Sequence, residues 1–213
     1  GVFDYVKDGR TVREYIALAF GTARDVVIYS PDEGITFPVK SSRKRFEEIV
    51  LPDQPAVPDA YAMLRGESPG ESVQLPTQPL PAIRMLTEYL VGAEANKAVV
   101  VIERLDLLLP AGDKATFPES RLALLSLLHR IGTDQALDLK GNLLILMTPS
   151  LEEVHSDLRA ASSGIRAIEV PLPDFDARLA YIEECIEKRD LTLEMRPAEL
   201  AAQTAGLYRR HIE

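Results

Sequence analysis

Several features typical of secreted, redox-active or membrane proteins are scarce in this sequence. Its 213 residues include one cysteine, Cys185, so no disulfide can form within the chain. The longest apolar runs, such as 98–102 and 143–147, are far shorter than the roughly 20 residues that a membrane-spanning helix requires. No signal peptide is visible either. We therefore expect a cytoplasmic protein that does not enter a membrane.

Residue patterns for metal binding or nucleophilic catalysis are also missing. His129, His155, His211 and Cys185 do not have the spacing of metal ligands, so the sequence predicts no metal site. The chain has neither a nucleophile elbow nor a Cys/His pair of the kind used in covalent catalysis. These absences argue against a serine or cysteine hydrolase.

Basic residues are outnumbered by acidic ones. The chain has 24 Lys and Arg against 33 Asp and Glu, which gives a formal net charge of −9 and argues against general affinity for nucleic acid. The one basic cluster, Arg43, Lys44 and Arg45, lies on the outer face of a helix expected over 42–50. We interpret this cluster as a solvated helix face rather than an anion site.

Apolar periodicity and capping residues predict helices that alternate with strands. The strand 98–102 is continuously apolar, which is typical of a strand in the middle of a parallel sheet. Prolines are so dense over 51–81 that only a short helix near 59–64 is expected there. The other predicted elements are helices at 11–21, 42–50, 81–91, 118–130, 150–158, 174–186 and 197–206, and strands at 26–29, 35–37, 142–147 and 165–170.

This alternation predicts an α/β fold with a doubly wound parallel sheet and the start of a small helical lid. We assign 1–172 to the α/β core, in which 51–81 is a proline-rich surface connection, and 173–213 to the beginning of the lid. The sequence does not start with methionine, and its last residues have the pattern of a helix interior. We therefore expect a fragment of a longer protein.

Four stretches, in this order, resemble the AAA+ superfamily of P-loop ATPases. Residues 99–106 resemble the Walker B strand, and 143–148 resemble the strand that ends in the sensor residue. Residues 166–174 resemble the last core strand and the start of the lid, and 204–207 resemble a turn inside the lid. The resemblance implies the α/β fold predicted above. It does not transfer the activity, because one fold carries many functions.

The phosphate-binding loop departs from the superfamily pattern. P-loop enzymes need a Gly-rich loop, a Lys on the phosphates and a Ser or Thr on Mg²⁺, but this chain contains no Gly-Lys-Ser or Gly-Lys-Thr. Where the resemblance places the loop, the chain has 30–36, which lacks a lysine and carries Asp32 and Glu33. We interpret Ser30 and Gly34 as relics of a nucleotide site.

The acidic residues that the superfamily uses for hydrolysis are also altered. Glu103 stands in the place of the Mg²⁺-binding Asp, and Arg104 replaces the Glu that orients the attacking water. Asp106 and Thr148 are further relics, while Pro149 occupies the position of the sensor asparagine and has no side-chain donor. We therefore expect no catalytic residue in this chain.

Two arginines, Arg159 and Arg166, lie where AAA+ modules place residues that reach a neighbour's γ-phosphate. Arg166 matches better by its spacing to 171–173, although a surface ion pair would explain it equally well. The resemblance suggests a degenerate module like the first one of tandem AAA+ proteins. Its partner would be a second AAA+ module in the same chain or other subunits.

The sequence thus favours a non-catalytic module, a pseudo-ATPase without a cofactor that serves assembly or regulation of an AAA+ ATPase. One alternative is an ATPase that binds ATP and Mg²⁺ atypically through Glu103, Asp106 and the loop around Gly34. Another is an unrelated doubly wound domain, in which 99–106 is only a buried strand. In all three, ligands would bind at the carboxyl ends of the strands, which bring Ser30, Glu103 and Thr148 together.

Overall fold

The computed structural model describes residues 12–51, 74–134, 139–189, 192 and 194–207. The chain divides into two compact units. The larger unit comprises 20–165, and the smaller one comprises 1–19 together with 166–213. The helix predicted near 59–64 lies outside the described residues.

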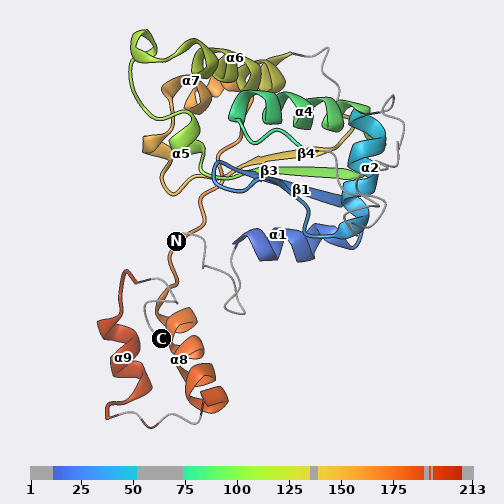
Figure 1. Ribbon diagram of the computed structural model, residues 1–213. Helices are drawn as coiled ribbons and strands as arrows, with labels where there is room; N and C mark the ends of the chain where they lie inside the picture. Colours follow the sequence, from blue (N-terminus) through green and yellow to red (C-terminus); the bar gives the residue numbers. More distant parts are fainter. Residues whose placement is uncertain (1–11, 52–73, 135–138, 190–191, 193, 208–213) are drawn as a thin grey trace, which may run out of the picture. The chain divides into compact units, whose positions relative to one another are not determined.

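The larger unit contains a four-stranded sheet with the strand order β2-β1-β3-β4 (Figure 1). Strands β1 (Asp25–Ser30), β3 (Ala98–Ile102) and β4 (Leu143–Leu146) are parallel, whereas β2 (Gly34–Thr36) runs antiparallel to β1. This arrangement confirms the predicted α/β fold with a mostly parallel sheet. It also confirms the four strands predicted near these positions.

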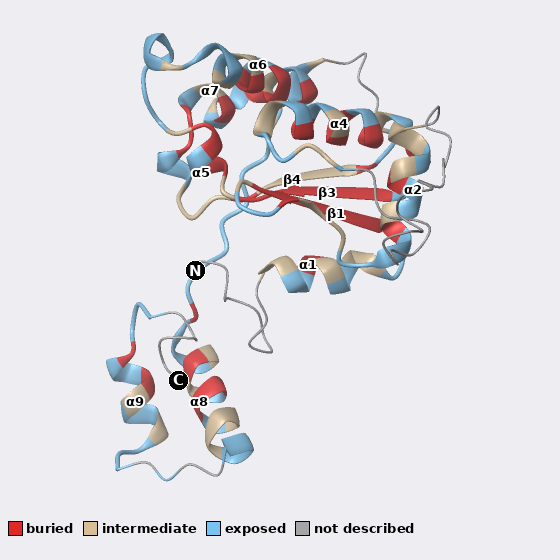
Figure 2. Cartoon of the chain, in the orientation of Figure 1, coloured by how far each residue is buried: buried red, intermediate tan, exposed pale blue. Residues whose placement is uncertain are grey.

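Burial follows the apolar pattern of each strand. Every residue of β1 and β3 is buried, as expected for the apolar run of β3 and for residues 26–29 of β1 inside a parallel sheet. All four residues of β4 are only half-buried, because β4 is the last strand in the order and has a hydrogen-bonded neighbour on one side. Figure 2 shows this contrast as red for β1 and β3 and tan for β4.

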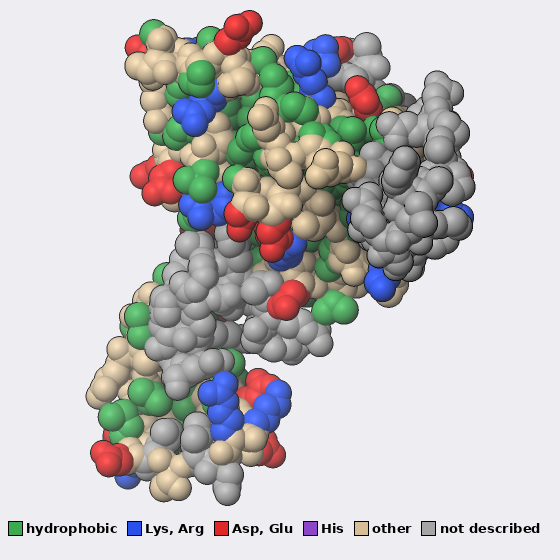
Figure 3. Space-filling view, in the orientation of Figure 1, with side chains coloured by type: hydrophobic (Ala, Val, Ile, Leu, Met, Phe, Trp, Pro, Cys, Tyr) green, Lys and Arg blue, Asp and Glu red, His purple; other side chains and the backbone are tan. Residues whose placement is uncertain are grey.

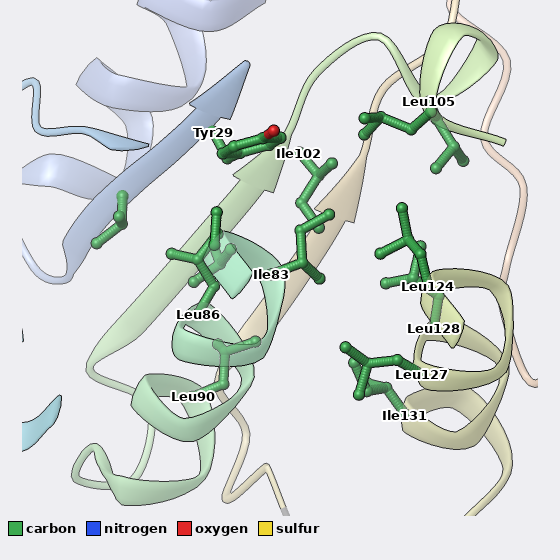
Figure 4. Packing of buried hydrophobic residues seen from close by; sticks show 14 of the residues in the cluster. Tyr29, Ile83, Leu86, Leu90, Ile102, Leu105, Leu124, Leu127, Leu128 and Ile131 are labelled. Carbon is green, nitrogen blue, oxygen red and sulfur yellow. The ribbon is translucent and has the colours of Figure 1, made fainter. Parts of the chain in front are cut away.

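Helices pack on the sheet and enclose the main hydrophobic core. Helix α2 (Lys40–Val50) contacts β1, α4 (Pro79–Gly92) contacts β3, and α6 (Glu119–Thr133) packs against α4. Prolines in the first turn of α4 suit a helix start, because proline fixes φ and needs no backbone donor there. Figure 4 shows the core between these elements, which includes Tyr29, Ile83, Leu86, Leu90, Ile102, Leu124, Leu127, Leu128 and Ile131.

Short helices follow the ends of β3 and β4. Helix α5 (Leu105–Leu108) and the 3-10 turn Lys114–Thr116 come after β3. The single helix predicted over 150–158 is divided into a 3-10 turn, Leu151–Glu153, and helix α7 (Ser156–Arg159). Two separate caps explain the division, because the side chains of Ser150 and His155 each accept a hydrogen bond from a backbone N–H two residues on.

The smaller unit contains residues 12–19 of α1 (Val12–Gly21) and two helices that contact each other, α8 (Phe175–Arg189) and α9 (Pro197–Gln203). The predicted cap of α8 is confirmed, because Asp174 accepts a hydrogen bond from the Ala177 N–H. The buried Arg178 donates from Nε to the Ala201 carbonyl and from its Nη1 to the Pro173 carbonyl, which joins the two helices.

The strand predicted over 165–170 is wrong. This segment has no regular secondary structure, and Ile168 and Val170 are 80% and 55% exposed. Alternating apolar residues suit a strand, but a strand forms only where a neighbouring chain pairs with its backbone. Among the described residues, none pairs with this segment.

Candidate functional site

The carboxyl ends of the three parallel strands lie side by side. The Glu103 N–H donates to the Tyr29 carbonyl at 2.9 Å, and the N–H after β4 donates to the last carbonyl of β3 at 2.8 Å. The hydrogen bonding between the parallel strands therefore continues one residue past the ends of β3 and β4. The structure places Ser30, Glu103 and Thr148 at this edge of the sheet, which we call the carboxyl edge.

The segment that the sequence analysis matched to the phosphate loop is a tight β-hairpin. Ser30 pairs with Gly34, and the Ser30 hydroxyl accepts a hydrogen bond from the Glu33 N–H. Gly34 has φ 72°, and a Cβ there would lie 3.3 Å from Thr77 Cγ2, so both backbone and space favour glycine. A P-loop leads from a strand into a helix. The segment 30–36 instead leads from β1 into an antiparallel strand.

The next helix along the chain begins at the opposite edge of the sheet. Asp25, the first residue of β1, accepts hydrogen bonds from the Ser42 hydroxyl at 3.0 Å and from Arg45 Nη1 at 2.9 Å. Both donors lie in the first two turns of α2. The amino end of α2 and its positive dipole are therefore near the amino ends of the strands, away from the carboxyl edge.

The basic cluster of α2 is matched by acidic residues. Arg43 pairs with Glu47 at 2.8 Å and Lys44 with Glu48 at 3.8 Å, both one helical turn further on. Because each cation has a carboxylate neighbour, the cluster has the character of a solvated helix face. Figure 3 shows the same intermixing on the face in view, where blue Lys and Arg side chains lie beside red Asp and Glu.

The central charged pair of the carboxyl edge is Arg104 with Asp106. Arg104 Nε lies 3.2 Å and 3.3 Å from the two oxygens of Asp106, and Nη2 lies 2.8 Å from Oδ2. The Asp106 side chain is 7% exposed and that of Arg104 is 44% exposed. The guanidinium therefore covers a carboxylate that is otherwise shielded from water.

Other carboxylates surround this guanidinium. The hydrogen bond to Asp106 is the largest of the effects that raise the pKa of Arg104, and the negative charges of Asp106, Glu153 and Asp32 raise it further. Asp32 belongs to the β1–β2 turn and Glu153 to the 3-10 turn after β4. Three segments thus direct negative charge toward one cation at the carboxyl edge.

The two remaining relics have different surroundings. Glu103 is buried, directly after β3. The Thr148 hydroxyl donates to the Ser150 carbonyl at 2.8 Å, which engages it in the turn that leads to Leu151–Glu153. Thr148 is thus at the expected edge, where its hydroxyl stabilises a local turn.

Arg159 and Arg166 are both exposed; Arg159 is the last residue of α7, and Arg166 is the first residue of the segment 166–213 of the smaller unit. Within the described part of the chain, neither guanidinium forms an ion pair or hydrogen bond. The surface ion pair considered for Arg166 is therefore not observed there.

Two further expectations concern metals and membranes. In the residues that the structure describes, no group of three or more His, Cys, Asp or Glu side chains is arranged to hold a metal ion. Over the same ranges, none of the helices has the length and apolar character needed to cross a bilayer.

Comparison with known families agrees with the strand pattern around the carboxyl edge. The family model described as "AAA+ chaperone, N-terminal Rossmann-like domain" matches residues 3–171. The chain belongs to this family. No curated protein matches the chain. The membership confirms the AAA+ relationship inferred from 99–106 and 143–148, and it assigns an AAA+-related role to this chaperone N-terminal domain.

Sequence reasoning found Arg104 and Asp106 separately but missed that they bind each other. Their separation by one residue was a signal, because a turn after a strand brings such side chains together. Nothing in the sequence indicated Glu153, which reaches the carboxyl edge only because 109–111 and 153–155 lie side by side. Ala111 N–H donates to the Glu153 carbonyl, and Pro110 pairs with Val154.

Proposed function

We propose that this AAA+ chaperone N-terminal domain is a non-catalytic module, a pseudo-ATPase that serves assembly or regulation of an AAA+ ATPase. The ATPase would be a second module of the same chain or a partner subunit. One observation carries the proposal: Arg104 occupies the position of the water-activating acid and is bonded to the nearby carboxylate of Asp106.

The chemistry of arginine supports this proposal. A general base must accept a proton near neutral pH. An arginine side chain stays protonated throughout that range, and its neighbours raise the pKa of Arg104 further. Arg104 therefore cannot deprotonate or orient a water molecule as a carboxylate does.

ATP and Mg²⁺, the ligands that AAA+ membership implies, do not fit the residues of the carboxyl edge. A triphosphate requires backbone donors and a lysine, whereas the β1–β2 turn presents Asp32 and Glu33. The helix dipole of α2 points its positive end toward the other edge, where Asp25 lies. Asp106 is already neutralised by Arg104.

The exposed arginines support a role beside an active ATPase. An arginine supplied by a neighbour can stabilise the charge that develops on a transferred phosphoryl group. Arg159 and Arg166 are exposed and have no carboxylate partner in the described residues, so either could bind an anion on another subunit. The proposal thus assigns them to an interface.

Calorimetric titration of the chain with Mg-ATP tests the absence of nucleotide binding, with thermal unfolding as a second measurement. We expect no heat and no shift of the unfolding midpoint. A ligand at 100 times its Kd would add about 2.7 kcal/mol of stability, so binding would be obvious. Saturable, Mg²⁺-dependent hydrolysis that disappears in Glu103→Ala would instead establish the atypical ATPase.

The interface role is tested in the full-length protein. We expect Arg166→Ala, or Arg159→Ala, to lower ATPase activity of the assembly about 100-fold or more, since such arginines contribute on the order of 10³ to 10⁵ in kcat. Arg43→Ala is the matched control, because Arg43 is paired within its own helix. Unchanged activity in both variants would refute the interface role and leave the nucleotide result unaffected.

A further inference from the structure

The contact between Arg104 and Asp106 has the geometry of a strong, two-pronged ion pair. Two guanidinium nitrogens face the two carboxylate oxygens at 2.8 to 3.3 Å. A planar guanidinium matches a carboxylate in this way, whereas an ammonium acts as a point charge. Asp106 is 7% exposed, so its negative charge depends on this partner more than a surface carboxylate would.

The backbone of Arg104 is held in an unfavourable conformation. Arg104 has φ 55° and ψ 49°, the left-handed region that favours glycine. Neighbouring hydrogen bonds impose this conformation, because the Glu103 N–H is bound to Tyr29 and the Leu105 N–H is bound to the Met147 carbonyl at 2.9 Å. The turn thereby aims the side chain at a residue two positions further on.

From these observations we propose that Arg104 is the resident cation of the carboxyl edge. Its guanidinium supplies to Asp106 the positive charge that a bound divalent metal ion would otherwise supply. The inference rests on the proposed function in one respect, because a module that bound Mg-ATP would need free carboxylates for its metal. It adds a regulatory consequence: the edge has one fixed state and does not respond to magnesium or nucleotide.

The surrounding structure supports a fixed edge. Arg104 is the N-cap residue of α5, and its carbonyl accepts hydrogen bonds from the Leu107 and Leu108 N–H groups. The negative charges of Glu153 and Asp32, from two other segments, also act on its guanidinium. The Arg104 guanidinium therefore offsets negative charge from the β1–β2 turn, from α5 and from the 3-10 turn after β4.

Glycine substitutions distinguish the effect of losing the Arg104 guanidinium from the effect of relieving its backbone strain. Arg104→Gly relieves the left-handed strain and also removes the cation, whereas Lys140→Gly relieves the same strain at φ 52° away from this edge. We expect Lys140→Gly to leave the thermal midpoint unchanged or slightly higher. Arg104→Gly should lower the thermal midpoint by about 4 °C or more, although glycine adopts this left-handed conformation without strain. An unchanged or raised midpoint in Arg104→Gly would overturn the proposal.

Chemical rescue then separates a resident cation from ordinary packing. Guanidinium chloride at a non-denaturing concentration should restore part of the midpoint of Arg104→Gly, compared with an equal concentration of sodium chloride. It should not do so in the double variant Arg104→Gly with Asp106→Asn. Rescue that is equal in the single and double variants would show a general salt effect and contradict the assignment.

A metal titration distinguishes failure of this inference from failure of the proposed function. The wild-type midpoint should be the same in EDTA, in Mg²⁺ alone and in Mn²⁺ alone. A rise with either ion that disappears in Asp106→Asn would overturn the role of Arg104. Binding of Mg-ATP would refute both the proposed function and the fixed state of the edge, whereas a response to the ions alone without binding of Mg-ATP would refute only the role of Arg104.

Discussion

The two edges of the sheet both contain buried polar side chains, but they are held in different ways. At the amino edge, Asn142 and Asp25 bind groups that are distant in the sequence. Asn142 accepts from the Lys97 and Ala98 N–H groups and donates to the Leu90 carbonyl, each at 2.9 Å. At the carboxyl edge, Asp106 binds a residue only two positions away.

This difference separates a structural edge from a candidate functional one. Hydrogen bonds from Asn142 to backbone groups join β3, β4 and α4 at the amino edge, and Asp25 ties β1 to α2 there through Ser42 and Arg45, so the role of this edge is to fix the fold. At the carboxyl edge, charged groups gather around Arg104, whose side chain remains partly exposed. Substitutions at the amino edge should therefore change stability most, and those at the carboxyl edge should change it less.

The largest effect is expected from Asn142→Ala. Removing this side chain leaves the buried Ala98 N–H, the part-buried Lys97 N–H and the buried Leu90 carbonyl without their partner, and each unsatisfied buried group costs about 1 to 3 kcal/mol. We expect a loss of about 3 kcal/mol in the free energy of unfolding, measured by urea denaturation. A loss below about 1 kcal/mol would show that this edge is not held by Asn142.

Asp25→Asn should have the next largest effect. The amide keeps an acceptor for the Ser42 hydroxyl but loses the ion pair with Arg45, whose side chain is 57% exposed and therefore screened by solvent. We expect a loss of about 1 kcal/mol, and a smaller dependence of stability on salt concentration than in the wild type. Ser42→Ala is the control that removes the other bond. Equal salt dependence in Asp25→Asn and wild type would contradict the contribution of the ion pair.

Tyr29→Phe tests the carboxyl end of β1 through pH. Burial raises the pKa of Tyr29 to about 12, so its contribution is complete below the unfolded value and is lost as pH rises through the folded value. The hydroxyl also donates to the Thr77 carbonyl at 3.1 Å, a bond that contributes about 1 kcal/mol.

We therefore expect the free energy of unfolding of Tyr29→Phe to be about 1 kcal/mol below that of the wild type at neutral pH. Between pH 10 and 12 the free energy of unfolding should fall less in the variant than in the wild type. Burial and then the negative charge of Asp25 also raise the pKa of Tyr89, near the amino edge, so some alkaline loss should remain. Urea denaturation at several pH values measures both the loss at neutral pH and the loss in alkali. Parallel curves for variant and wild type would refute the assignment to Tyr29.

The smallest effect is expected from Lys114→Gln. The hydrogen bond from Lys114 lowers the pKa of Asp157, so this contribution is present above the unfolded pKa and is lost as pH falls through the folded value. Because both side chains are partly exposed, we expect a loss of about 0.5 kcal/mol or less at pH 7 that vanishes in acid. Lys44→Gln is the control on a solvated helix face. A larger loss in acid than at pH 7 would contradict this sign.

Sequence reasoning was most successful where one residue pattern has one structural solution. The run at 98–102 can satisfy its apolar side chains only when both faces are covered, and it is a buried parallel strand. Sequence reasoning failed at 165–170, because alternating apolar residues indicate which side chains a strand would bury but not whether a neighbouring strand is present to pair with it. The helix over 150–158 was divided because two local caps compete with one continuous helix.

The candidate site was predictable in position but not in its internal contacts. Because the carboxyl ends of parallel strands meet at one edge, Ser30, Glu103 and Thr148 could be placed together from strand assignments alone. A second strand after the turn was also predicted from the sequence, but its register with β1, in which Ser30 pairs with Gly34, was not. The reason is that a turn sequence fixes only a few dihedral angles, while register depends on the rest of the sheet.

By itself, the sequence determined the absence of any Gly-Lys-Ser or Gly-Lys-Thr, the alternation of helices with the four strands of the sheet, and the AAA+ relationship. These properties depend on residue identity and on apolar periodicity, which are local. Only the tertiary structure decided that Arg104 neutralises Asp106 and that Glu153 and Asp32 act on the same guanidinium. Electrostatic partners are set by distance in space, and distances between separate segments exist only after β1, β3 and β4 have paired.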